Sequence, residues 1–171
     1  MGVSSLLAMS LVNGRFVVQP KFSARETLNL IENFKITSLY LVPTLFHDLI
    51  EFSSFNKERV ISCKKLGFAG ASMTSGLIKK IRNNFNAKHL VNHYGSSEIY
   101  TFTIEPKAFD KPGSAGKAGL NQMIRVVKIN SNNPNDLTLV GEEGEIIANI
   151  LSDESFNAVS YTHLTLPTNG T

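Results

Sequence analysis

Short strand-forming runs alternate with helix-start signals through the first half of the chain, and this alternation restricts the fold more than any other feature. The runs 38–42 and 65–69 are apolar and rich in strand-forming residues. Each is followed within a few residues by a helix-start signal, and a further run, 89–92, follows the last of these helix patterns. Repeated alternation with short connections predicts a parallel sheet covered by helices.

Local signals mark the ends of the individual elements. The four residues from Ser23 to Glu26 form a capping box, which predicts that a helix begins there. Pro43 suits the first turn of the helix after the run 38–42, because its missing N–H would have no partner there in any case. That run is expected to be a strand buried on both faces. An earlier strand is expected at 15–19, ended by a proline.

The pattern changes after Glu98. Glycine and asparagine turns separate further strand-like runs, and no helix signal intervenes. These runs are 101–104, 124–129, 137–140 and 145–150, and the polar stretch 130–136 is expected to be the tip of a hairpin. The sequence therefore predicts an α/β fold class: a parallel sheet with covering helices, followed by a mostly β subregion.

Composition excludes several classes of protein. The 17 basic and 14 acidic residues are scattered and give a net charge of only +3, which argues against a nucleic-acid partner. A single cysteine, Cys63, excludes an internal disulfide and a cysteine-cluster metal site. The apolar stretch 6–12 is far short of the ~20 residues of a membrane span and lacks the features of a signal peptide. The expected location is the cytoplasm.

The last residues do not fit the rest of the chain. From Val159, ten residues match one reading frame of a common transposon-end sequencing adapter, residue for residue. We therefore expect 1–157 to be one partial domain and 158–171 to be an adapter-derived, non-native tail. His163, in this tail, should carry no functional role. The alternative is a genuine β-segment.

A run of small residues closes the strand at 65–69. The segment 66–73 reads Leu-Gly-Phe-Ala-Gly-Ala-Ser-Met, and Thr74 or Ser75 is expected to cap the next helix. The expected buried stripe of that helix is Leu77, Ile81 and Phe85. Ligands bind at the carboxyl edge of a parallel sheet, and small residues let a flat group approach the backbone. A plain strand-to-helix turn is the alternative.

A second motif, Tyr94-Gly-Ser-Ser-Glu98, ends the next strand. It combines an aromatic ring, a flexible glycine, two hydroxyl groups and a carboxylate. Those groups suit a nucleotide, through ring stacking, phosphate binding and an oxygen-bound metal ion. Taken alone, Glu98 could equally be a solvated loop carboxylate.

Together the two motifs resemble the adenylate-forming (AMP-binding) superfamily, which includes acyl-CoA synthetases, luciferases and the adenylation domains of peptide synthetases. Three further segments resemble the same family: 37–45 (Thr-Ser-Leu-Tyr-Leu-Val-Pro-Thr-Leu), 111–117 (Lys-Pro-Gly-Ser-Ala-Gly-Lys) and 141–146 (Gly-Glu-Glu-Gly-Glu-Ile). The five elements fall in the family's order and cover nearly everything before Ala158.

The resemblance implies roles for residues in both motifs. Gly70, Ala71 and Ser72 would line the adenine pocket, and Tyr94 would stack on the adenine. Ser97 would contact the α-phosphate and Glu98 would bind Mg²⁺, which makes these two the candidate catalytic residues. The floor between nucleotide and acyl group would be formed by Asn92, His93, Gly95 and Ser96. A structural role for His93 is the alternative.

The resemblance also implies an activity, that of an ATP-dependent acyl-CoA synthetase. Such enzymes join a carboxylic acid to AMP and then transfer the acyl group to CoA, with Mg²⁺ as cofactor. The family's phosphate loop, ribose-binding aspartate and C-terminal catalytic lysine have no counterpart here, so this chain alone is expected to be an inactive fragment. The alternatives are an amino-acid-activating domain of a peptide synthetase and a non-catalytic α/β interaction module.

The adapter match generates a first prediction. Long-read sequencing of the source locus should replace the codons from Val159 onward with a different sequence, because adapter sequence is absent from intact genomic DNA. Finding the codons for 159–168 uninterrupted in the genome would show the tail to be natural.

Overall fold

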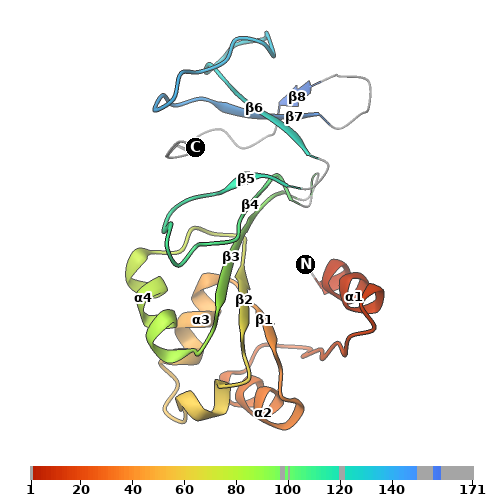
Figure 1. Ribbon diagram of the computed structural model, residues 1–171, viewed down its shortest axis with the longest axis vertical. Helices are drawn as coiled ribbons and strands as arrows, with labels where there is room; N and C mark the ends of the chain where they lie inside the picture. Colours follow the sequence, from red (N-terminus) through yellow and green to blue (C-terminus); the bar gives the residue numbers. More distant parts are fainter. Residues whose placement is uncertain (1, 97–98, 100, 120–121, 150–155, 159–171) are drawn as a thin grey trace.

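The computed structural model consists of an α/β part and a separate small sheet (Figure 1). It describes residues 2–96, 99, 101–119, 122–149 and 156–158. The helices are α1 (Gly2–Leu11), α2 (Ala24–Phe34), α3 (Pro43–Ile50), the 3₁₀ helix η1 (Lys57–Val60) and α4 (Ser75–Asn84). The strands are β1 (Ser38–Tyr40), β2 (Lys65–Phe68), β3 (His89–Tyr94), β4 (Thr103–Glu105), β5 (Lys117–Ala118), β6 (Met123–Val127), β7 (Glu145–Asn149) and β8 (Phe156–Ala158).

The larger sheet has the strand order β1-β2-β3-β4-β5. Its first three strands are parallel, and β4 and β5 continue it in antiparallel fashion. Leu39, Leu66 and Leu90 form one row across the parallel strands. The smaller sheet, β6-β7-β8, is antiparallel. The predicted α/β fold class is confirmed, with the addition that the main sheet is mixed.

The predicted helix starts are confirmed. The Ser23 hydroxyl caps α2 by accepting a hydrogen bond from the backbone N–H of Glu26 at 3.4 Å. Pro43 occupies the first turn of α3. The Thr74 hydroxyl caps α4 by accepting from the N–H of Leu77 at 3.3 Å. Each cap satisfies a backbone donor that the helix itself leaves without a partner.

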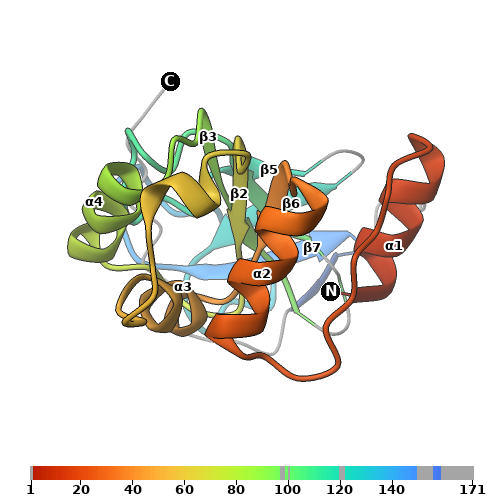
Figure 2. The ribbon, with the colours of Figure 1, turned by 90° about the horizontal axis from the view of Figure 1, so that it is seen from below.

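The core lies between one face of the larger sheet and the helices α2, α3 and α4. Leu66, Phe68 and Leu90 project from that face because alternate residues of a strand share a side. They join one buried cluster with the helix residues Leu28, Ile31, Phe46, Leu49, Ile78 and Ile81 and with Phe85, which directly follows α4. Figure 2 shows α3 and α4 together on one side of the sheet. In the expected stripe of α4, Ile81 and Phe85 are buried, but Ile78 takes the place of Leu77, which is only partly buried.

Cys63 belongs to this core and has no exposed surface. Burial raises the pKa of its thiol to about 12, so the thiolate does not form at neutral pH. The structure therefore supports a packing role for this cysteine.

Two expected strands are absent, and a third is less buried than expected. The segment 15–19 is irregular, and no strand pairs with it in the described part of the chain. At 137–140 only Leu137 forms a bridge, to Val127, while Val140 is 80% exposed. The strand β1 lies at an edge of the sheet, with Ser38 exposed, so it is not buried on both faces. Strand pairing depends on distant neighbours, which local sequence patterns do not specify.

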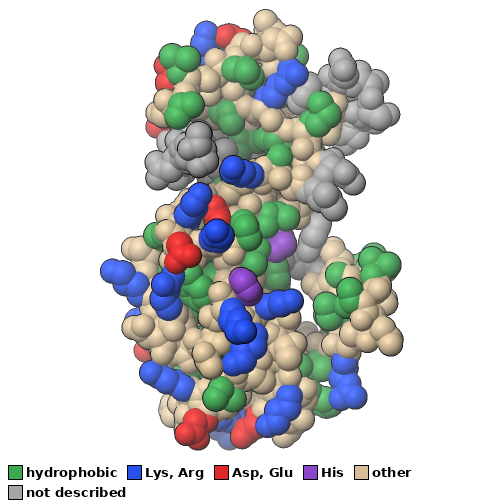
Figure 3. Space-filling view, in the orientation of Figure 1, with side chains coloured by type: hydrophobic (Ala, Val, Ile, Leu, Met, Phe, Trp, Pro, Cys, Tyr) green, Lys and Arg blue, Asp and Glu red, His purple; other side chains and the backbone are tan. Residues whose placement is uncertain are grey.

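The helix α1 was not expected, and none of its residues is buried. Figure 3 shows apolar side chains gathered over it, at the right of the view. They include Val3, Leu6, Leu7 and Leu11, of which Leu11 is 88% exposed. Among the described helices, none is long and apolar enough to cross a membrane.

Two glycines of the loop between β4 and β5 have similar backbones but different surroundings. Gly113 has a φ of +84° and Gly116 a φ of +86°, a region that favours glycine. A Cβ on Gly116 would collide with the backbone of Ile104 and Glu105, whereas nothing lies near a Cβ on Gly113. The loop therefore rests directly on β4 at Gly116.

This difference predicts unequal costs of alanine substitution. Gly113→Ala should reduce the free energy of unfolding by about 1 kcal/mol through backbone strain alone. Gly116→Ala should cost at least about 2 kcal/mol more, because the new methyl group displaces the strand backbone. Urea unfolding of the two variants measures both values, with Gly113→Ala as the matched control. Equal losses would contradict the close approach at Gly116.

Candidate functional site

The carboxyl ends of β1, β2 and β3 meet at one edge of the sheet. Tyr40 lies opposite Gly67, and Phe68 lies opposite Asn92. The strand β2 then leads into the turn 70–72, and β3 leads into 94–96. Both predicted motifs therefore end at the same edge, where open parallel sheets bind their ligands.

The turn 70–72 is accessible. Gly70 adopts a φ of +84°, and a Cβ there would contact only Val42, at 3.6 Å. Gly70, Ala71 and Ser72 are all exposed, which leaves their backbone groups open to a flat ligand. Thr74 caps the following helix and so fixes where the turn ends.

The side chains of Asn92 and Tyr94, at the end of β3, are partly buried, and each contacts a residue from another segment. The Asn92 side-chain amide donates a hydrogen bond to the carbonyl of Ser114 at 2.9 Å. The Tyr94 ring lies 5.6 Å from the Phe102 ring, with the planes tilted by 42°. This aromatic contact packs the Tyr94 ring against Phe102.

Ser96 is hydrogen-bonded to Ile99 through both its backbone and its side chain. Gly95 is exposed and Ser96 is half-buried. The backbone N–H of Ser96 donates to the carbonyl of Ile99 at 2.9 Å, and the Ser96 hydroxyl accepts from the N–H of Ile99 at 3.3 Å. Ser97 and Glu98, the candidate catalytic and metal-binding residues, lie outside the described residues, so their roles stay predictions.

His93 points to the opposite face of β3 from Asn92 and Tyr94 and meets Tyr40. The two rings lie 5.3 Å apart in an edge-to-face arrangement. Tyr40 can lie there because Gly67 has no side chain: a Cβ would come within 2.5 Å of the tyrosine ring. Sequence reasoning missed Tyr40 and Gly67, because only the strand register brings them to His93.

The His93 imidazole is held in a poorly solvated position. Its Nδ1 atom is buried and has no hydrogen-bond partner within the part of the chain that the structure describes. Burial lowers the pKa of His93 from its ordinary value of 6.5, because a low-dielectric surrounding disfavours the charged ring. At neutral pH the ring is uncharged and can serve as donor or acceptor to a bound molecule.

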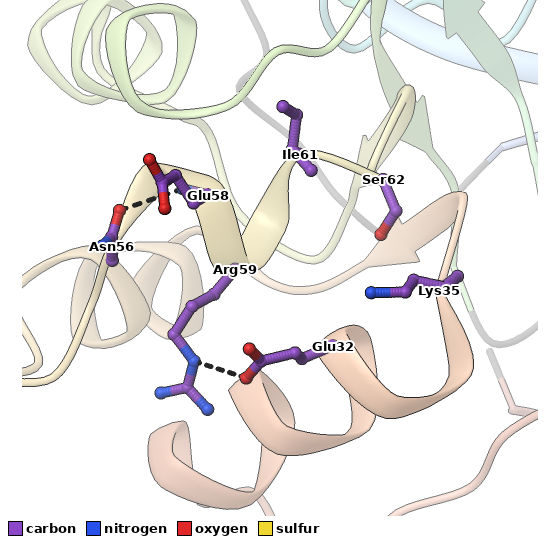
Figure 4. A pocket seen from close by; sticks show the side chains of 7 residues that line it. All are labelled: Glu32, Lys35, Asn56, Glu58, Arg59, Ile61 and Ser62. Atoms are coloured by element: carbon purple, nitrogen blue, oxygen red, sulfur yellow. Dashed lines mark hydrogen bonds and ion pairs between the residues drawn. The ribbon is translucent and has the colours of Figure 1, made fainter.

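A pocket of about 210 Å³ lies at the amino-terminal edge of the sheet, away from both motifs. Its lining comprises Glu32, Lys35, Asn56, Glu58, Arg59, Ile61 and Ser62 (Figure 4). The Arg59 guanidinium forms an ion pair with Glu32 at 2.9 Å and donates a second hydrogen bond to the Asn29 side chain at 2.6 Å, so its charge already has a partner. Within the described ranges, no three His, Cys, Asp or Glu side chains come close enough to hold a metal ion. The strand-end motifs therefore remain the stronger candidate site.

Comparison with known proteins identifies relatives of the chain. Residues 1–149 match the family model described as AMP-binding enzyme. A 4-chlorobenzoate–CoA ligase from an Arthrobacter species is 24% identical over 144 residues, which are 84% of this chain and 27% of the ligase. A luciferin 4-monooxygenase from Nipponoluciola cruciata is 29% identical over 68% of this chain and 21% of its own length. The chain thus spans about a quarter of these relatives.

Solved structures share the fold. ATP-bound MatB from Rhodopseudomonas palustris superposes with a TM-score of 0.74 at 20% identity, covering 85% of this chain and 28% of MatB. The O-succinylbenzoate coenzyme A synthetase of Bacillus subtilis, in complex with ATP and magnesium, gives a TM-score of 0.70 at 22% identity over 86% of this chain and 30% of the synthetase.

The environment of His93 predicts a pH dependence of stability. Because its folded-state pKa lies below the unfolded value of 6.5, the folded chain resists protonation of this ring. The contribution of the neutral His93 ring to the free energy of unfolding is complete above pH 6.5. It is lost as the pH falls through the folded-state pKa. Urea unfolding between about pH 7.5 and about pH 5 should show a smaller acid-side loss for His93→Gln than for the wild type.

The matched control is His47→Gln, which replaces an exposed histidine of α3. It should retain the acid-side loss of the wild type. Equal pH profiles for His93→Gln and the wild type would show that His93 does not resist protonation in the folded chain.

Proposed function

The chain belongs to the AMP-binding enzyme family, and on that premise we propose that it is part of an ATP-dependent acyl-CoA synthetase. The observation that carries the proposal is the meeting of two motifs at one sheet edge: the exposed turn 70–72 on β2 and the Tyr94 motif on β3. The whole protein would activate a carboxylic acid as an acyl-adenylate and transfer the acyl group to CoA.

The described residues fit the nucleotide in specific ways. The backbone of Gly70, Ala71 and Ser72 is open to hydrogen-bond the edge of the adenine, and Tyr94, held by Phe102, offers a ring for stacking. Asn92, His93, Gly95 and Ser96 would line the boundary between nucleotide and acid. His93 would contribute an uncharged ring there, which avoids a fixed positive charge beside the reacting carboxylate.

The roles proposed for Ser97 and Glu98 rest on the family resemblance. Ser97 would donate to the α-phosphate, and Glu98 would hold Mg²⁺. When bound, the metal ion would neutralise the charge that develops on the phosphate. Oxygen ligands are what this ion requires, and one or two protein carboxylates are usual.

As part of this proposal, residues 1–157 would form a partial AMP-binding domain, the 158–171 tail would be adapter-derived, and the protein would work in the cytoplasm. The chain alone would be inactive, because the family's phosphate loop, ribose-binding aspartate and catalytic lysine have no counterpart among its 171 residues. CoA as acceptor is favoured by the CoA ligases among the relatives, whereas a carrier-protein thiol would indicate an amino-acid-activating domain.

Substitutions in the complete protein should separate the roles of Glu98 and Tyr94. Glu98→Ala should lower kcat by about a hundredfold and raise the KM for ATP much less, because charge stabilisation acts in the transition state. Tyr94→Ala should mainly raise the KM for ATP, by about tenfold, because stacking acts in ground and transition states alike. Tyr94→Phe should be mild. Acid-dependent ATP–pyrophosphate exchange measures all of these.

Glu58→Ala is the control, since Glu58 lies on η1 at the opposite edge of the sheet. It should leave both kinetic constants unchanged. Near wild-type kinetics for both Glu98→Ala and Tyr94→Ala, in folded protein, would overturn the assignment of these two residues to the site. A folded complete protein without exchange activity would favour the rival interpretation of a non-catalytic α/β module.

A further inference from the structure

Glu105 is a buried carboxylate that lies outside both predicted motifs. It sits on β4 with only 6% of its surface exposed. One carboxylate oxygen accepts a hydrogen bond from the backbone N–H of Lys107, and the other accepts from the Ser114 hydroxyl, both at 2.9 Å. In the described part of the chain no basic side chain forms a salt bridge with it. Burying a carboxylate is costly unless hydrogen bonds compensate, so these two bonds are what keep it in place.

Ser114 connects Glu105 to the candidate site. Its hydroxyl oxygen also accepts from the backbone N–H of Gly116 at 3.0 Å, which fixes the loop where it rests on β4. Its carbonyl accepts from the side-chain amide of Asn92 at 2.9 Å. A continuous set of hydrogen bonds therefore runs from Glu105, through the loop 111–117, to β3.

The sheet register makes this connection short. Asn92 on β3 lies directly opposite Glu105 on β4, so both side chains project from the same face. Tyr94, two residues after Asn92, lies on that face as well. A loop held over this face thus reaches the strand end that carries the nucleotide motif.

We propose that Glu105 is a positioning residue: through Ser114 it clamps the loop 111–117 against β4, and this clamp fixes the Asn92 side chain at the edge of the candidate site. The clamp itself follows from the contacts above. Its importance for adenylation rests on the proposed function.

The chemistry of the clamp distinguishes two substitutions. Glu105→Ala removes both acceptors and leaves the Lys107 N–H and the Ser114 hydroxyl without their partner. Glu105→Gln keeps one acceptor for Lys107, and its NH₂ group can donate to the Ser114 oxygen, which has a second lone pair available. Glu105→Gln should therefore keep most of the loop ordering that Glu105→Ala removes.

The first measurement uses the 171-residue chain and needs no activity. The ¹H–¹⁵N nuclear Overhauser effect of the Asn92 side-chain amide reports whether that group is ordered. Glu105→Ala should reduce it toward the value of a freely rotating side chain, and Glu105→Gln should keep it near wild type. Glu142→Ala is the matched control, because Glu142 accepts a backbone N–H at 2.9 Å in a remote turn. An unchanged Asn92 signal in Glu105→Ala would overturn the clamp.

The second measurement uses the complete protein and ATP–pyrophosphate exchange. Glu105→Ala should lower kcat/KM for ATP about tenfold or more, with glutamine recovering most of the loss. Should Glu105→Ala fail to fold, Ser114→Ala replaces it, since that change removes only the hydroxyl.

The two measurements separate the proposals. A mobile Asn92 with unaltered kinetics would overturn the positioning role while leaving the proposed function intact. A wild-type protein without exchange activity would overturn the proposed function, and the nuclear Overhauser effect would then decide the clamp alone.

Discussion

The candidate site depends on the parallel alignment of β1, β2 and β3, because only that alignment brings three strand ends to one edge. The alignment is held by the apolar row Leu39, Leu66 and Leu90 and by the helices packed over it. Full burial of a leucine side chain contributes about 1.5–3 kcal/mol. A slip by one residue would turn Leu66 and Leu90 away from the helices, so the register is strongly specified. The exposed turn after β2 and the Tyr94 motif after β3 owe their proximity to this register.

The strand β3 is fixed from both of its faces. On one face, the Tyr40 ring rests on Gly67 and meets His93 edge to face. On the other, the Ser114 carbonyl accepts from Asn92, and Ser114 is in turn held by Glu105. The contact on one side is largely apolar and that on the other is a hydrogen-bond network. This arrangement leaves the Tyr94 motif at the end of a strand whose preceding residues have little freedom.

Features with local causes were predictable from the sequence, and features with distant causes were not. Ser23, Pro43 and Thr74 mark helix starts through contacts within one turn, and all three were found as predicted. The strand expected at 15–19 has no partner strand in the described chain, and at 137–140 the pairing with β6 does not extend beyond a bridge at Leu137. The turn 70–72 was recognisable from its small residues. Tyr40 contacts His93, 53 positions away, and Glu105 is linked through Ser114 to Asn92, 13 positions away; only the folded sheet brings these residues together.

The larger sheet has a further property: the spatial order of its strands equals their order in the sequence. Each strand pairs with the one before it, and no strand has to be inserted between two that are already paired. The sheet can therefore grow by successive additions at one edge as the chain leaves the ribosome. Because each strand pairs with its predecessor, each pairing step has to close only the connection between those two strands. The strand β3, which leads into the Tyr94 motif, would be paired soon after α4 has formed, before most of the β-rich second half has been synthesised.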